Sequence, residues 1–189
     1  MKLNATAVVI AGGKSSRMQK DKALLPFGKY NTLSEYQFVR LSKIFENVYL
    51  SSKVNKFNFK VDLIEDNYLV SSPLVALISI FENLEVEEAF VLSVDAPFVS
   101  ESVIIQLYNE AKEGVDVIVA ESRQGLEPLC AIYRKSFLKE AYVALDENRH
   151  RLQGLFYNLN VQKVKINDKE VFTNLNYPEE YQEASKRAR

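Results

Sequence analysis

The sequence predicts one α/β domain in three layers, in which helices cover both faces of a mostly parallel mixed sheet. Short apolar runs rich in β-branched residues alternate along the chain with segments whose apolar residues recur at helical spacing. This alternation is typical of βαβ units, which bury a parallel sheet between helices. The length of 189 residues suits a single domain, so we expect residues 1–189 to form one unit.

The first half of the chain supplies four expected strands and two expected helices. The run ATAVVIA ends in two glycines, and AFVLSV stops at an aspartate, as buried strands do before turns. Ser72 and Pro73 precede an apolar-periodic segment, which is the pattern of an N-cap and a first-turn proline. We expect strands at 5–11, 48–50, 61–64 and 89–94, and helices at 33–45 and from 73 onward.

The second half continues the alternation with a closing helix. The run VDVIVA is β-branched, and the last segment begins with a proline and is strongly polar on one side. We expect strands at 115–120, 129–133, 161–166 and near Phe172, and helices at 103–111, 137–145, 152–158 and 178–188.

Composition excludes several classes of site and partner. Lys and Arg total 24 and Asp and Glu total 25, so there is no electrostatic reason to expect nucleic acid or a membrane as a partner. The single cysteine, Cys130, and the single histidine, His150, rule out a disulfide and a Cys/His zinc site. No run of 18 apolar residues occurs, and residues 1–6 do not resemble the start of a signal peptide, so we expect a cytoplasmic protein.

Two polar features follow expected strands and should meet at one edge of the sheet. Gly12 and Gly13 follow the first strand, and Asp95 follows the strand at 89–94. Ligands of open α/β sheets bind beyond the carboxyl ends of the strands. The coincidence predicts a ligand site at this edge.

The segment from Ala11 to Lys22 has the composition of an anion-binding loop. Adjacent glycines let backbone N–H groups approach an anion closely, and four cationic residues lie between positions 14 and 22. The spacing fits neither the Walker A pattern nor Gly-x-Gly-x-x-Gly. From composition alone, a solvated basic loop is an equal alternative, and its place after a buried strand favours phosphate binding.

The same segment resembles a known signature. The residues from Ile10 to Met18 (IAGGKSSRM), followed by DKALL from Asp21 to Leu25, resemble the nucleotidyltransferase superfamily, and the second part most resembles the molybdenum cofactor guanylyltransferase (MobA) family. The resemblance implies a Rossmann-like nucleotidyltransferase fold. It also implies that the enzyme joins GMP from GTP to molybdopterin, with pyrophosphate as the other product. Gln19 stands where relatives usually have glycine.

The resemblance assigns roles within the loop and at the first aspartate. The backbone of Ile10, Ala11, Gly12 and Gly13 is expected to lie against the nucleotide, and Arg17 and Lys22 to contact its phosphates.

Asp95, in the run VDAPF, is a carboxylate placed to hold a hard cation, although an aspartate that caps a turn has the same spacing. The resemblance makes Asp95 the ligand of Mg²⁺, the expected cofactor.

Asp66 is the expected contact to the nucleoside. It follows a short strand, and a carboxylate can accept hydrogen bonds from the N–H groups of guanine, whereas the alternative is an exposed loop acid. Nearby, the family pattern Gly-Pro-Leu-x-Gly is replaced by a sequence with Ser72 and Ala76 in place of both glycines. This departure leaves the base selectivity open.

Asn174 and Asn176 are the expected acceptor contacts. They lie two residues apart, on one side of an extended segment, and resemble the family's Asn-x-Asn-x-Pro-Glu motif beside the pterin. Asn176 can instead cap the helix that begins at Pro178. Residues 149–151 (RHR) form a cationic cluster for which surface solvation is a simpler explanation than contact with the acceptor phosphate.

The expected reaction is in-line attack of the acceptor phosphate on the α-phosphorus of GTP. That nucleophile is already anionic at neutral pH, so no general base is needed, and catalysis reduces to positioning and charge neutralisation by Mg²⁺ and the loop cations. The alternatives are a related cytidylyl- or sugar-nucleotide transferase and a non-catalytic nucleotide-binding protein. Whether further proteins deliver the molybdenum cofactor or collect the product is left open.

Overall fold

A seven-stranded mixed sheet organises the molecule. The computed structural model describes residues 2–12, 20–168, 170–175 and 177–188. The strand order is β3-β2-β1-β4-β6-β5-β7, and only β6 runs antiparallel to its neighbours, β4 and β5. The strands are β1 (Leu3–Ile10), β2 (Phe45–Ser52), β3 (Asp62–Glu65), β4 (Glu88–Ser93), β5 (Val117–Ser122), β6 (Gly125–Arg134) and β7 (Val161–Lys165).

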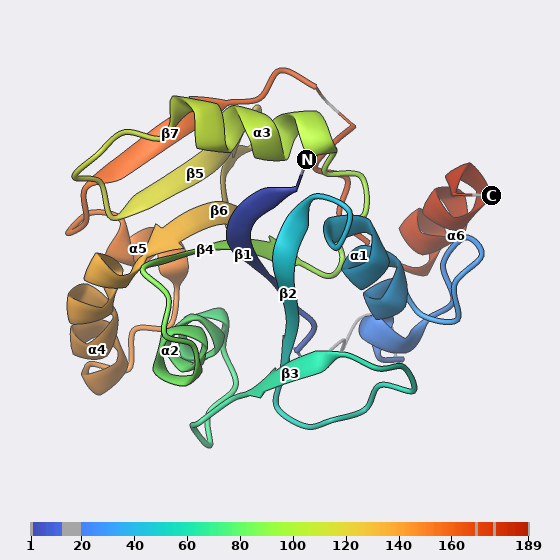
Figure 1. The fold of residues 1–189 in the computed structure, drawn as a ribbon, viewed down its shortest axis with the longest axis horizontal. Helices are drawn as coiled ribbons and strands as arrows, with labels where there is room; N and C mark the ends of the chain where they lie inside the picture. Colours follow the sequence, from blue (N-terminus) through green and yellow to red (C-terminus); the bar gives the residue numbers. More distant parts are fainter. Residues whose placement is uncertain (1, 13–19, 169, 176, 189) are drawn as a thin grey trace.

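Helices lie on both faces of this sheet, which gives three layers. Figure 1 shows α2, α4 and α5 together on one side of the twisted sheet, and α1 and α3 on the other. No helix in the described part of the chain is long and apolar enough to span a bilayer. The helices are α1 (Leu33–Leu41), α2 (Pro73–Asn83), α3 (Glu101–Glu110), α4 (Leu138–Asp146), α5 (Leu152–Leu155) and α6 (Pro178–Arg187), with 3₁₀ turns η1 (Lys22–Leu24) and η2 (Lys135–Phe137).

The central strand β1 is buried on both faces and divides the apolar interior in two. Val8 belongs to the core under α2 and α4, whereas Ala7 and Val9 belong to the core under α1 and α3, as the alternation of side chains along a strand requires. Between the sheet and the second group of helices, the rings of Phe45 and Phe90 stack with centroids 5.5 Å apart. Both rings are fully buried.

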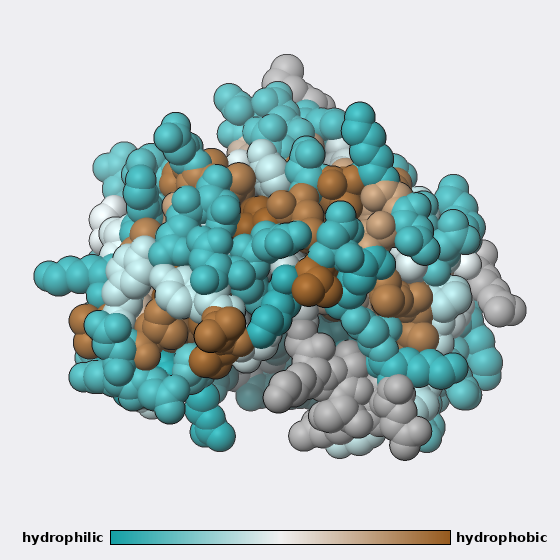
Figure 2. Space-filling model, turned by 90° about the horizontal axis from the view of Figure 1, so that it is seen from below, coloured by the Kyte–Doolittle hydropathy of each residue, from teal (hydrophilic) through white to brown (hydrophobic). Residues whose placement is uncertain are grey.

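One face of the molecule is mostly polar. Figure 2, which views the molecule from below relative to Figure 1, shows a mostly hydrophilic face with hydrophobic residues in separate patches. Apolar side chains are therefore largely used in the two cores.

The predicted fold class is confirmed, and several predicted boundaries are wrong. The helix expected over 33–45 ends at Leu41, because Phe45 starts β2 and packs inside the sheet. The segment near Phe172, expected to be a strand, forms a turn in which the amide of Thr173 donates to the carbonyl of Glu170. The helix expected over 152–158 ends at Leu155.

The order of the strands opens a crevice at the edge of the sheet where a ligand site is predicted. After β1 the chain adds β2 and β3 on one side, and it then crosses to place β4 on the other side of β1. The connections leaving β1 and β4 therefore diverge at their carboxyl ends, which is where ligands bind in open α/β sheets.

We predict that Phe90→Ala lowers the free energy of unfolding by about 3–5 kcal/mol, because it removes a ring that is fully buried in the central strands. Urea denaturation followed by circular dichroism measures the change. Tyr157→Ala is the matched control, since that ring is 92% exposed and should change the value by less than about 0.5 kcal/mol. Equal effects of the two substitutions would contradict the assigned core.

Candidate functional site

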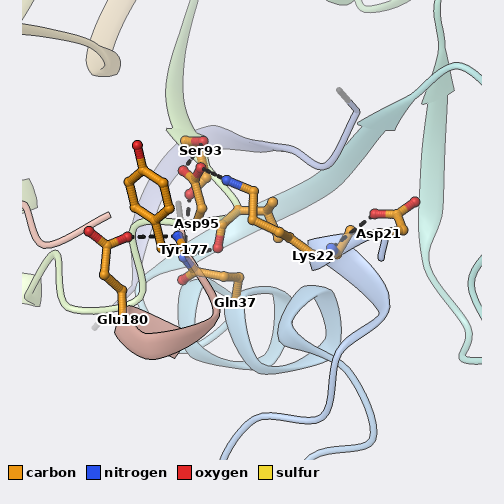
Figure 3. A network of polar contacts seen from close by, with 9 residues as sticks. Asp21, Lys22, Gln37, Ser93, Asp95, Tyr177 and Glu180 are labelled. Carbon is orange, nitrogen blue, oxygen red and sulfur yellow. Dashed lines mark hydrogen bonds and ion pairs between the residues drawn. The ribbon is translucent and has the colours of Figure 1, made fainter. Parts of the chain in front are cut away.

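An ion pair between Lys22 and Asp95 occupies the carboxyl edge of the sheet. The Nζ atom of Lys22 lies 2.6 Å from Oδ2 of Asp95, and the hydroxyl of Ser93 donates to Oδ1 at 2.6 Å (Figure 3). The side chains of Lys22 and Asp95 are 16% and 17% exposed. Both carboxylate oxygens are thus held in a largely desolvated environment, where charge interactions are stronger than in water.

The backbone of Asp95 is fixed from two directions. It lies in a turn directly after β4, in which the amide of Ala96 donates to the carbonyl of Ser93 at 3.2 Å. The carbonyl of Asp95 accepts from the amide of Leu175 at 3.0 Å. The C-terminal segment that carries Asn174 is thereby attached to the same turn.

Helix α1 supports this turn from beneath through a buried amide. The side chain of Gln37, which is fully buried, donates from Nε2 to the carbonyl of Val94 at 3.2 Å. Its Oε1 accepts from Nη2 of Arg40 at 2.6 Å, and Nη1 of Arg40 donates to the carbonyl of Val99. Burial lowers the pKa of Arg40. Gln37 and Arg40 together satisfy carbonyl groups of the loop that follows β4.

Lys22 is positioned by the 3₁₀ turn η1 and by its cap. Asp21 caps this turn, because its Oδ1 accepts from the amide of Ala23 at 3.0 Å. The other carboxylate oxygen of Asp21 contacts Nζ of Lys56 at 2.5 Å, and the same Nζ donates to the carbonyl of Ala11 at 3.0 Å. The turn that carries Lys22 is therefore tied to the end of β1.

A cavity of about 280 Å³ is lined by Ser93, the residue whose hydroxyl donates to Asp95. Two of its polar atoms, the hydroxyl of Ser51 and Oδ1 of Asp66, are buried without a hydrogen-bond partner within the described ranges. Unsatisfied buried acceptors of this kind are costly unless a ligand completes them. Burial raises the pKa of Asp66, and the positive charge of Lys53 opposes this rise. The cavity is lined by Ile10, Gly12, Ser51, Asp66, Ser71, Ser72, Pro73, Ala76, Ser93 and Leu129.

A second cavity of about 260 Å³ lies beside the first and shares Ser93 and Leu129 with it. Asp95 and Asn174 both face this second cavity. Burial raises the pKa of Glu127 in its wall, and a hydrogen bond from Ser122 opposes the rise. The remaining lining residues are Ala96, Pro128, Cys130 and Phe172.

A bulge in β6 builds the wall between the cavities. Val119 pairs with Ala131, whereas the next residue, Ala120, pairs with Glu127, so residues 128–130 have no partner on β5. Bulges of this kind re-aim side chains at the edge of a sheet. Here the bulge presents Leu129 to both cavities.

The structure brings together most of the predicted site residues that it describes. Ile10 and Gly12 line the first cavity with Asp66, and the amide of Ala11 donates to the carbonyl of Ser51 at 2.8 Å. Lys22 and Asp95 are in contact, and Asn174 lies on the side of the second cavity. Gly13, Arg17 and Asn176 lie outside the described residues. Helix α6 has Tyr177 in its N-cap position.

Two features of the first cavity are not predicted by the sequence: Ser51 in its wall and the contact of Ser72 with His150. Ser51 ends up there because β2 lies beside β1, and its position at the end of a predicted strand was the available signal. Ser72 caps α2 as predicted, and its hydroxyl also lies 3.0 Å from Nδ1 of His150. The histidine therefore supports the cavity wall.

The cationic cluster at 149–151 does not present all its charges to a ligand. The guanidinium of Arg149 lies 3.2 Å from Glu140 and 2.5 Å from Glu147. Nε2 of His150 lies 2.8 Å from the side-chain oxygen of Asn148.

Within the described ranges, no group of three or more His, Cys, Asp or Glu residues is arranged to hold a metal ion. A cation at Asp95 would therefore take most of its ligands from water and from a bound substrate.

Comparisons with known proteins agree with this architecture. Residues 7–162 match the model of the family described as MobA-like NTP transferase domain. The chain is 37% identical over 185 residues to a molybdenum cofactor guanylyltransferase of Campylobacter jejuni, with 96% of both chains covered.

Two solved structures share the fold at lower sequence identity. One is a molybdopterin-guanine dinucleotide biosynthesis protein A from Archaeoglobus fulgidus, with a TM-score of 0.83 at 22% identity over 96% of this chain and 97% of the other. The other is a 2-C-methyl-D-erythritol 4-phosphate cytidylyltransferase from Thermus thermophilus, with a TM-score of 0.74 at 14% identity over 98% and 99%.

We predict that Asp66→Asn stabilises the protein at pH 7. Burial raises the pKa of Asp66 in the folded state. As the pH rises above about 3.9, the carboxyl of Asp66 therefore ionises in the unfolded chain before it ionises in the folded protein. Over that pH range the free energy of unfolding falls, until the carboxyl has ionised in the folded protein too. An asparagine has no such dependence. Urea denaturation from pH 4 to pH 7 should show the advantage of the variant growing with pH. A variant that is less stable than wild type at pH 7 would contradict the assignment.

Proposed function

This chain belongs to the MobA-like NTP transferase family, and on that premise we propose that it transfers GMP from GTP to the phosphate of molybdopterin. It is an enzyme that transfers nucleotidyl groups in molybdenum cofactor biosynthesis. The finer proposal is carried by one observation: Asp95, in contact with Lys22, accepts a hydrogen bond from Ser93, which lines both cavities at the carboxyl edge of the sheet. One cavity suits the nucleoside and the other suits the acceptor.

The first cavity suits a base that offers hydrogen-bond donors. Ser51 and Asp66 line this cavity, and each has a buried oxygen that finds no hydrogen-bond partner in the described part of the chain. Guanine carries an N–H in its ring and an exocyclic amine on the same edge, so it can donate to both a carboxylate and a hydroxyl. Cytosine and adenine offer only their exocyclic amine as a donor. This difference supports GTP as the donor.

The chemistry of Asp95 fits Mg²⁺. This ion usually keeps several waters and binds through one or two carboxylates plus substrate phosphates. Asp95 offers one largely buried carboxylate in the wall of the second cavity. When bound, Mg²⁺ would supply neutralisation of charge on the phosphates. Asp95 would hold it, and the ammonium of Lys22 would then turn from the carboxylate to the phosphates. Arg17 is proposed to join Lys22 on the strength of the family signature.

The second cavity suits the acceptor. Its amide, Asn174, can both donate to and accept from a pterin ring, and the C-terminal segment places it beside Asp95. Asn176 is proposed as its companion from the family motif.

In the reaction, an oxygen of the molybdopterin phosphate forms a bond to the α-phosphorus, the bond from that phosphorus to the bridging oxygen breaks, and pyrophosphate leaves. The nucleophile is already an anion, so no side chain has to remove a proton. His150 accordingly supports a cavity wall through Ser72.

Two alternatives remain distinguishable by experiment. A cytidylyltransferase shares the fold and would require cytosine in the first cavity. A sugar-nucleotide transferase would instead differ in the acceptor that it uses. A non-catalytic nucleotide-binding protein would need neither the contact between Lys22 and Asp95 nor a second cavity large enough for an acceptor.

We predict that purified protein with magnesium and molybdopterin releases pyrophosphate from GTP and at least about tenfold more slowly from CTP, ATP or UTP, since a site built on hydrogen bonds rejects bases that lack the matching groups. A coupled pyrophosphate assay measures the rates. Faster release from CTP would favour the cytidylyltransferase alternative, and no release with any triphosphate would favour a binding protein.

We predict that Lys22→Ala lowers kcat with GTP by about 100- to 1000-fold, as expected for the loss of a group that stabilises charge in the transition state. Asp95→Asn should shift the magnesium titration to higher concentration, because it removes the carboxylate that is proposed to hold the ion. Lys60→Ala, on an exposed lysine between β2 and β3, is the control and should leave both values unchanged. Near-normal turnover by a folded Lys22→Ala protein would exclude the proposed role of Lys22.

A further inference from the structure

Lys56 joins two points of the chain that flank the glycine-rich segment. It lies in the connection between β2 and β3, and its ammonium contacts the carboxylate of Asp21 at 2.5 Å and the carbonyl of Ala11 at 3.0 Å. Ala11 follows directly after β1, and Asp21 directly precedes η1. One side chain therefore fixes the chain where it leaves the sheet and where it enters the turn that carries Lys22.

The contact continues from Asp21 to Asp95 in a series of short links. One oxygen of Asp21 faces Lys56, and the other accepts from the amide of Ala23 and so caps η1. The turn places Lys22 with its Nζ 2.6 Å from Asp95. The position of Lys56 thus determines the position of the backbone from which Lys22 reaches its carboxylate.

The environment of Lys56 makes this link firm. Its side chain is 17% exposed and that of Asp21 is 34% exposed, so water screens the pair less than a surface ion pair. The ring of Phe57, itself buried, lies 5.8 Å from the ammonium. Three neighbours therefore hold the charge of Lys56 in one place.

We propose that Lys56 is a positioning residue for Lys22. It keeps the backbone of η1 fixed, so that Lys22 can exchange Asp95 for a phosphate by a movement of its side chain alone. This inference rests on the proposed function for the role of Lys22 toward phosphate, and on the contacts alone for the role of Lys56 toward η1. Pre-organised positioning of this kind lowers the cost of reaching the reactive arrangement.

A direct contact of Lys56 with the nucleotide is the competing explanation. Lys56, Gly12 and Asp21 line a third cavity of about 530 Å³, which adjoins the first at Gly12 and Ser71. A direct contact would act through the charge of Lys56 whether or not Asp21 is ionised. A positioning role requires the pair.

A double-mutant cycle separates the two explanations. The variants are Lys56→Met, Asp21→Asn and the double mutant. Asparagine retains an oxygen that can cap η1 and removes the charge that Lys56 contacts. Lys60→Met is the matched control on an exposed lysine, and Lys56→Arg tests rescue by another cation. Circular dichroism confirms that each variant is folded.

The first readout needs no ligand. Amide hydrogen exchange at Ala23, measured by NMR on the full chain, should be about five- to tenfold faster in Lys56→Met and in Asp21→Asn, because the cap opens locally more often. The double mutant should exchange no faster than the faster single variant, and Lys60→Met should match wild type. Unchanged exchange at Ala23 in Lys56→Met would overturn the proposal, whatever the substrate of the enzyme.

The second readout is turnover. The two single variants should lower kcat for pyrophosphate release about ten- to a hundredfold, with no further loss in the double mutant and substantial recovery in Lys56→Arg. Losses that multiply in the double mutant would overturn the positioning role in favour of direct contact. If wild type releases no pyrophosphate from GTP, the proposed function fails, and the exchange data still decide the role of Lys56.

Discussion

The contact between Lys22 and Asp95 is the interaction on which the arrangement of the site depends. A carboxylate that is 17% exposed at the end of a buried strand is costly unless a cation compensates its charge. The cation comes from a segment 73 residues earlier in the chain, so satisfying Asp95 requires the region after β1 to fold back across the end of β4. The backbone of the same turn is held by α1, through Gln37 and the carbonyl of Val94, and by the C-terminal segment, through the amide of Leu175 and the carbonyl of Asp95.

The antiparallel strand β6 explains why two cavities adjoin at Ser93 and Leu129, beside Asp95. In a wholly parallel sheet only the carboxyl ends of strands would lie at this edge. Because β6 runs in the opposite direction between β4 and β5, its beginning lies there instead, and its bulge places Leu129 between the cavities. Ser93 lies on the same boundary and holds Asp95. The second cavity thus combines the end of β4 with the start of β6, which supplies Glu127, Pro128, Leu129 and Cys130.

The residues predicted from the sequence were those whose signal is local. Ser72 precedes a proline, and the roles of Lys22 and Asp95 rest on the short runs DKALL and VDAPF, which resemble the family signature. Ser51 and Lys56 were not, because their importance depends on β2 lying beside β1, and the alternation of strands and helices does not determine the order of strands in a sheet. The strand expected near Phe172 does not form, for a similar reason. The apolar side chains there pack into the core, and the backbone forms a turn instead of pairing with another strand.

Ser72 and Ala76 stand where the family pattern has glycine, and both line the first cavity. The two replacements change the wall of the cavity, and the backbone there does not require glycine. Ser72 has a φ of −155°, an extended conformation that any residue adopts, so no glycine is required there. Its hydroxyl caps α2 and contacts His150, a contact that glycine cannot make. Ala76 lies within a regular helix, where its methyl group lines the cavity.

Neither replacement changes the oxygen atoms of Asp66 and Ser51 in the wall of the first cavity. Selectivity for guanine would then depend on those two side chains, and the changes at 72 and 76 would alter the width of the cavity.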